Sequence, residues 1–63
     1  MNLTQQMEAL IDQHGVRNLL LELAFIAAEK ADHVRANWQD ETTARTWEHA
    51  SRICDAAQLK VDV

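Results

Sequence analysis

The stretch Leu19–Ala28, which reads LLLELAFIAA, determines how this chain can fold. Glu22 is its only polar residue, so a helix formed here is apolar nearly all round. Such a helix is normally buried on more than one side. We therefore expect a long helix over residues 16–37 that packs against protein on two faces.

The two expected faces of this helix carry different residues. The main face, which we expect against a neighbouring helix, is formed by Val16, Leu20, Leu23, Ala27, Val34 and Trp38. A second apolar patch, which points away from the main face, is formed by Leu21, Ala24, Phe25 and Ala28. A first helix can cover part of this patch through Met7 and Leu10. We expect a second protomer to cover the rest, so the patch is the predicted self-interface.

Local signals place one further helix on each side of the long one. Thr4 can cap a helix over residues 4–13, and Gly15 is typical of the left-handed residue that follows a helix end. Asp40 is a favoured N-cap for a third helix over residues 41–58. The chain has no proline and one glycine, too few turn residues for several β-strands. An all-α fold follows from these signals.

The expected third helix separates into an apolar seam and a charged face. The seam residues, spaced alternately by four and three, are Thr43, Trp47, Ala50, Cys54, Ala57 and Val61. The opposite face carries Glu41, Arg45, Glu48, Arg52 and Asp55, which alternate in sign and are typical of a solvated surface. The seam spacing indicates an antiparallel hairpin. We therefore predict one domain over residues 1–63: a short amino-terminal helix plus a hairpin of two longer helices, oligomerising into a bundle.

Length and charge narrow the functional class. A domain of 63 residues buries only about 60% of the surface of its unfolded chain, so its core is marginal without a partner. The formal net charge of -4 argues against nucleic-acid binding by phosphate neutralisation. No run approaches the roughly 18 apolar residues of a membrane helix, and no signal-peptide pattern is present. We expect a cytoplasmic protein that binds neither nucleic acid nor membranes.

No group of residues has the composition of a catalytic or metal site. Glu29 and His33 are four residues apart, but a di-iron bundle requires histidine where Asp32 stands. Cys54 lies in the apolar seam without a base beside it. The chain also lacks a glycine-rich loop. We therefore predict no enzymatic activity, no metal and no cofactor.

Residues around the connection between the two longer helices are the candidates for binding. Trp38 offers aromatic area beside hydrogen-bonding groups, and nearby cations can complement an anionic ligand such as a nucleotide. The candidate binding residues are Lys30, His33, Arg35, Asn37, Trp38, Gln39 and Asp40. The sequence leaves an alternative open, in which the polar residues of this set only satisfy free groups at the helix ends and Trp38 belongs to the core.

The central third of the chain also carries a resemblance. Its residues are Glu29-Lys30-Ala31, His33, Arg35, Asn37-Trp38-Gln39-Asp40, Ala44, Trp47 and Ala50. This stretch resembles short all-helical proteins that are encoded in phages and prophages. The resemblance includes no catalytic or binding signature; it implies a setting, because small phage proteins of this size often bind a host protein or a host defence component.

Three functional hypotheses follow. The first is a non-enzymatic accessory protein of phage type that self-associates and binds, and thereby inhibits, a host or host-defence protein. The second is an oligomer that sequesters a small anionic ligand such as a nucleotide. The third is a structural component of a helical bundle, which differs from the first because it has no discrete target.

Overall fold

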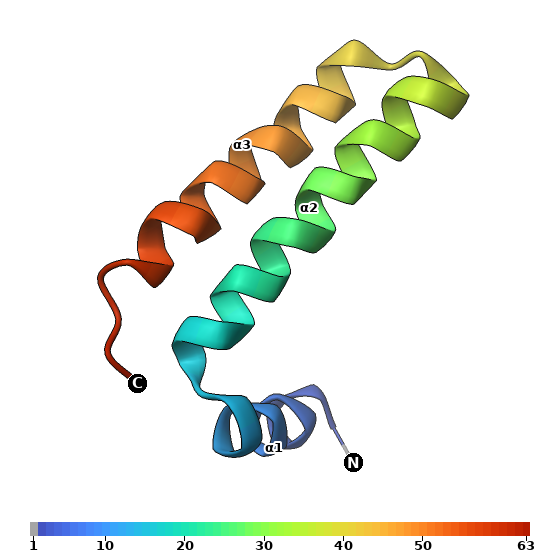
Figure 1. The fold of residues 1–63 in the computed structure, drawn as a ribbon. Helices are drawn as coiled ribbons and strands as arrows, with labels where there is room; N and C mark the ends of the chain where they lie inside the picture. Colours follow the sequence, from blue (N-terminus) through green and yellow to red (C-terminus); the bar gives the residue numbers. More distant parts are fainter. Residues whose placement is uncertain (1) are drawn as a thin grey trace.

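Three helices make up the structure, and the two longer ones lie side by side as an antiparallel hairpin (Figure 1). The computed structural model describes residues 2–63. Helix α1 spans Leu3–His14, α2 spans Val16–Trp38 and α3 spans Glu41–Gln58. The described residues contain no β-strand. The all-α prediction is confirmed, and every predicted helix bound lies within one residue of the observed bound.

The helix caps explain where the elements begin. At α1 the Gln5 N–H donates to Asn2 Oδ1 (2.9 Å), and the Asn2 N–H donates to Gln5 Oε1 (3.1 Å). This reciprocal pair is a capping box, so the prediction that Thr4 caps the helix is wrong; Thr4 lies inside the first turn. At α3 the Thr43 N–H donates to Asp40 Oδ1 (3.1 Å), which confirms Asp40 as the N-cap.

Gly15 joins α1 to α2 in a conformation that other residues rarely adopt. Its φ is 82° and its ψ is 157°, a region that is essentially restricted to glycine. A Cβ atom here would also lie 3.3 Å from the carbonyl carbon of Val63. The Arg17 N–H donates to the main-chain oxygen of Val63 (2.7 Å), so the last residues of the chain lie against this junction.

Alanine side chains form the contact between α2 and α3. The buried hydrophobic residues are Ala24, Ala27, Ala31 and Ala44. Among residues 2–63, no large side chain is fully buried. The Ser51 hydroxyl donates to the Ala24 carbonyl across the seam (2.6 Å), and Arg17 Nε donates to Gln58 Oε1 (3.1 Å). These bonds set a register in which Ala31 lies opposite Ala44.

The main face predicted for α2 is wrong in part. Leu23, expected in the core, is 45% exposed, while its neighbour Ala24 is buried. Trp38, at the far end of the same predicted face, is 73% exposed. The rest of the predicted face holds, since Ala27 is buried and Val16, Leu20 and Val34 are half-buried. The face that contacts α3 is therefore shifted by part of a turn toward Ala24 and Ala31, because close approach of the helices selects the alanine stripe.

The seam predicted for α3 is displaced in the same way. Thr43 is exposed and Ala44 is fully buried, so the prediction of Thr43 as a seam residue is wrong. Trp47 and Cys54, also expected in the seam, are half-buried. Glu48, expected on the solvated face, is half-buried as well. The observed seam thus lies between the two predicted faces.

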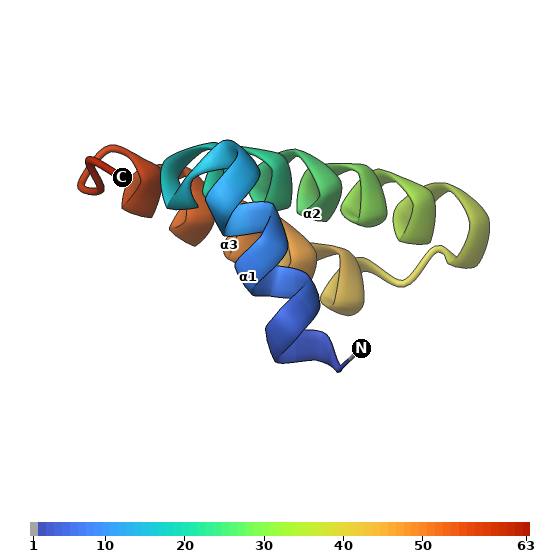
Figure 2. The same ribbon diagram turned by 90° about the horizontal axis from the view of Figure 1, so that it is seen from below.

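The molecule is thin and open for its size. Its Cα trace extends over 38 × 29 × 12 Å. The smallest of these extents, 12 Å, is less than the roughly 13–15 Å that the Cα atoms of two stacked helix layers span. The radius of gyration is 13.5 Å, against about 11 Å for a compact chain of this length. Figure 2 shows the cause: α1 leaves the hairpin instead of packing along it. No helix in residues 2–63 has the length and apolar character that a membrane span requires.

Candidate functional site

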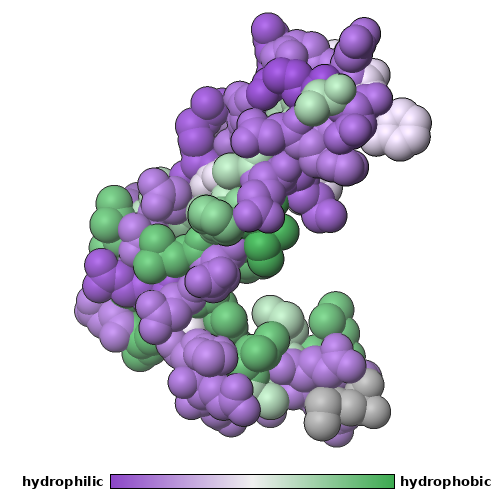
Figure 3. Space-filling view, turned by 45° about the vertical axis from the view of Figure 1, so that its right-hand side comes forward, coloured by the Kyte–Doolittle hydropathy of each residue, from purple (hydrophilic) through white to green (hydrophobic). Residues whose placement is uncertain are grey.

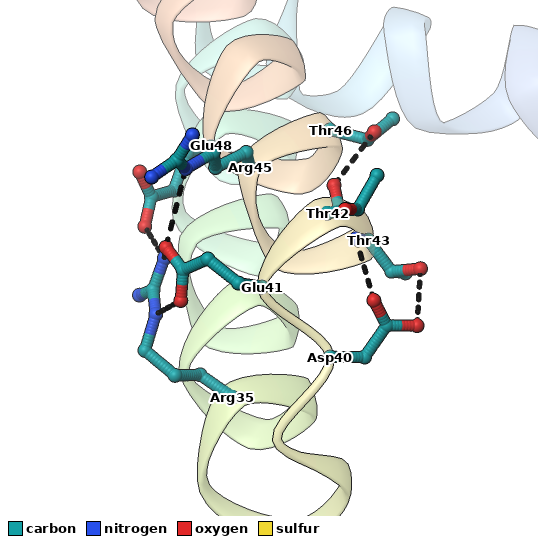
Figure 4. A network of polar contacts seen from close by, with 8 residues as sticks. All are labelled: Arg35, Asp40, Glu41, Thr42, Thr43, Arg45, Thr46 and Glu48. Atoms are coloured by element: carbon teal, nitrogen blue, oxygen red, sulfur yellow. Dashed lines mark hydrogen bonds and ion pairs between the residues drawn. The ribbon is translucent and has the colours of Figure 1, made fainter.

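Arg35, one of the predicted binding residues, is held in a salt-bridge network between the two long helices (Figure 4). Its Nε donates to Glu41 Oε2 (2.8 Å), and its Nη2 donates both to Glu41 Oε1 (3.0 Å) and to Glu48. Arg45 Nε also donates to Glu41 (3.3 Å), one turn along α3. Arg35 therefore joins the helices beside their connection, and two carboxylates already complement its charge.

The network also makes the hairpin sensitive to acid. The hydrogen bonds and charge of Arg35 hold the pKa of the Glu41 carboxyl below its ordinary value, and Arg45 adds to the effect. A carboxyl with a lowered pKa in the folded state stabilises the fold above its unfolded pKa. That contribution is lost as the pH falls through the folded pKa, so this contact weakens in acid.

The polar residues of the connection satisfy the ends of the helices. The Asn37 amide donates to the His33 carbonyl (2.9 Å) in the last turn of α2, and Gln39 ends that helix with a left-handed φ of 52°. Asp40 accepts from the Thr43 hydroxyl (2.7 Å) as well as from its N–H, and these bonds lower the pKa of Asp40. The structure favours the helix-end alternative for Asn37 and Asp40. Trp38 remains exposed beside them.

Two predicted binding residues, Lys30 and His33, line a shallow groove of about 520 Å³. The rest of the lining is Ile26, Glu29, Val34 and Trp47. Lys30 Nζ lies 5.9 Å from the centre of the Trp47 ring, which is a cation–π distance. The groove thus offers an aromatic ring with one cation above it, although Glu29 offsets part of that charge.

A second apolar feature lies toward the amino-terminal end of α2, where α1 leaves the hairpin (Figure 1). We call it the α1–α2 notch. One side is α1, whose exposed apolar residues are Leu3, Met7, Leu10 and Ile11, and the other is the amino-terminal half of α2, where Phe25 follows Leu21 by one helical turn. The corner is a pocket of about 460 Å³ lined by Leu10, His14, Asn18, Leu19, Leu21 and Glu22. Figure 3 shows the hollow between the two lobes, with hydrophobic residues on both walls.

The walls of the notch are apolar and only partly covered. Phe25 is 63% exposed, and Leu3 is 72% exposed. Helix α1 has no fully buried residue, and Met7, Leu10 and Ile11 are 36–40% exposed, so its apolar stripe is only partly covered by its own chain. Met7 and Leu10 do not cover the α2 patch as expected; α1 reaches it only at the corner.

Three of the four residues of the predicted self-interface lie outside the hairpin seam. Leu21, Phe25 and Ala28 are exposed on α2. Ala24 is buried and its carbonyl accepts from Ser51 of α3, so its assignment to a self-interface is wrong. The physical reason is that the contact face of α2 is shifted toward its alanine stripe, which includes Ala24.

The α1 wall of the notch was not predicted as a site. Its signal was present in the spacing of the apolar residues, which follow at i, i+4, i+7 and i+8 from Leu3 and form one helical face. That face was expected to pack within the chain, because nothing in the sequence indicated that α1 diverges. Within residues 2–63, no three histidine, cysteine or acidic side chains gather closely enough to hold a metal ion.

No family model, curated protein or solved structure matches this chain.

Proposed function

We propose that this chain is a non-enzymatic interaction protein that acts by presenting the α1–α2 notch to another protein chain. The observation that carries the proposal is the uncovered apolar surface on both walls of the notch. Large apolar patches on a small soluble protein mark interaction sites, since their exposure to water is unfavourable. The groove at Lys30, by contrast, is shallow and mixed in charge.

The total accessible area supports this proposal. The structure exposes 4999 Å², whereas a compact monomer of 7.2 kDa exposes about 4,100 Å². The excess of about 900 Å² is close to the roughly 800 Å² that each partner contributes to a standard protein interface. A partner that buried about this area would bring the exposed surface to the value expected for a compact chain.

The biological effect of this interaction depends on which protein is bound. Following the resemblance to phage-encoded proteins, we propose that the assembled protein occludes a surface of a host protein and thereby inhibits it. The structural alternative, a bundle component without a discrete target, uses the same surface. The two differ in whether a second kind of protein is bound.

Site-specific photo-crosslinking in cells tests the proposal. A photoreactive phenylalanine analogue is placed at Phe25, inside the notch, or at Ile53, an exposed apolar residue on the outer face of α3. We expect one discrete adduct from position 25 and none from position 53. The mass of the adduct identifies the partner. Absence of a discrete adduct at position 25, or equal labelling at both positions, would contradict the proposal.

One observation favours a second candidate function, the binding of a small anionic ligand. It is the placement of Lys30 over Trp47 beside His33, which gives the groove a cation and an aromatic face. Titration calorimetry with a panel of nucleotides tests it. Binding that Lys30→Ala weakens at least about tenfold, and that Lys60→Ala leaves unchanged, supports the second function. No heat with any nucleotide rejects it.

A further inference from the structure

We infer that the α1–α2 notch is occupied by a second copy of this chain, in a two-fold dimer in which α1 of each protomer enters the notch of the other. The inference rests on the proposed function, since it names the chain that covers the same surface. It goes further because it assigns one geometry to the contact. Each notch in the dimer is completed by a helix that the partner copy supplies.

The shape of the notch favours a helix as its occupant. An amphipathic helix is needed to fill an apolar angle between two helices, because one apolar stripe must contact both walls. This chain itself carries such an element in α1, which has 12 residues, one apolar face and no buried side chain. The same molecule therefore presents both the open notch and the helix that fits it.

Two-fold symmetry closes the assembly. In a two-fold dimer, a contact of surface A with surface B occurs twice, so both copies bury the same residues. If Met7 of one protomer packs near Phe25 of the other, the reverse contact forms at the same time. Both notches are then filled, and neither copy retains an open apolar wall that leads to continued assembly.

Area and charge are both compatible with a second copy. The excess exposed area of about 900 Å² per chain fits the roughly 800 Å² that one partner of a stable dimer buries. Glu22 is the only charged residue between Leu19 and Ala28, so a second copy meets few like charges at the α2 wall. The ion pairs of Arg35 lie near the opposite end of α2, away from this contact.

The first experiment measures molar mass in solution by light scattering over a concentration series. We expect the wild-type chain at twice its 7.2 kDa mass. Phe25→Glu places a charge in the notch, and we expect it to raise the dimer dissociation constant at least about tenfold. Ile53→Glu is the matched control, because it introduces the same charge at an exposed apolar position outside the notch. Circular dichroism verifies that each variant keeps its helices.

The second experiment tests which surfaces meet. Met7→Lys changes the α1 wall and Phe25→Glu changes the α2 wall, so each variant alone is expected to be monomeric. In an equimolar mixture, one contact of the mixed dimer is native, and in the other the introduced lysine of one chain faces the introduced glutamate of its partner. We expect the mixture to recover the dimer mass, and the recovery to weaken with added salt.

The outcomes separate this inference from the proposed function. A wild-type monomer overturns the dimer, while a discrete photo-crosslink from Phe25 to a different protein leaves the proposed function standing. A wild-type dimer that Phe25→Glu does not weaken, or that Ile53→Glu weakens equally, also overturns the inference, because the contact then lies elsewhere. Variants that dissociate singly but do not re-form a dimer when mixed overturn the α1-to-α2 arrangement.

Discussion

Replacing Ala31 by leucine tests whether alanines set the distance between α2 and α3. Ala31 is 1% exposed and lies opposite Ala44, which is fully buried. Leucine adds three carbon atoms at this contact and has nearly the same helix propensity as alanine, so the change reports on packing. Overpacking of this kind costs about 1–3 kcal/mol. The whole domain is expected to be stable by only about 3–9 kcal/mol, so the loss is large.

The assay is urea unfolding followed by far-ultraviolet circular dichroism, at one protein concentration for all variants. Ala36→Leu is the matched control, because Ala36 lies on the same helix and is exposed. We expect Ala31→Leu to lower the free energy of unfolding by about 1–3 kcal/mol and the control to change it by less than about 0.5 kcal/mol. Equal effects at the two positions would rule out the alanine seam.

Three further predictions use the same unfolding assay. Leu23→Ala is expected to lower the free energy of unfolding by about 1–2 kcal/mol, less than the roughly 2–5 kcal/mol for a buried leucine, because Leu23 is half exposed. A larger loss of stability would show that Leu23 is buried in the core. Gly15→Ala is expected to cost about 1–3 kcal/mol, since its backbone conformation is restricted to glycine; unchanged stability would contradict this strain. Arg35→Gln is expected to destabilise the chain at pH 7, with the difference from wild type shrinking as the pH falls through the lowered pKa of Glu41 and this carboxylate is protonated; a pH-independent difference would contradict the assigned ion pair.

The sequence was sufficient to predict the helices because their ends depend on local chemistry. Gly15 and Asp40 act within a few residues of their own positions, through backbone conformation and capping. The error at Thr4 is of the same local kind: Asn2 competes for the same helix end and forms a reciprocal bond with Gln5. A shift of two residues in the cap leaves the helix itself unchanged.

The faces of the helices were harder to predict because they depend on the partner helix. Leu23 and Ala24 are adjacent in an apolar run, and hydrophobicity alone favours burying the leucine. The hairpin instead buries the alanine, because the backbones approach closely along a stripe of small residues. No property of α2 alone distinguishes these two packings. Which residue is buried depends also on Ala44 and Ser51 of the facing helix α3.

The candidate site was predicted in part for the same reason. Lys30 and His33 do share a groove, since they lie on one side of α2. Arg35 does not join them, because Glu41 and Glu48 hold it at the other helix. The residue types near the connection indicate that charged and aromatic side chains lie there. Which of these side chains form ion pairs within the chain depends on how the hairpin folds.

The alanine seam connects the fold to the proposed function. Small side chains give close helix contact but bury little apolar area, so the hairpin alone gains little hydrophobic stabilisation. The large apolar residues, Phe25 and Leu21 among them, are left on the outside of α2, and α1 diverges with its own apolar face uncovered. A chain with this distribution is most stable when another helix enters the notch. In the proposed dimer, association completes the hydrophobic core, and disrupting it is expected to lower stability as well as binding.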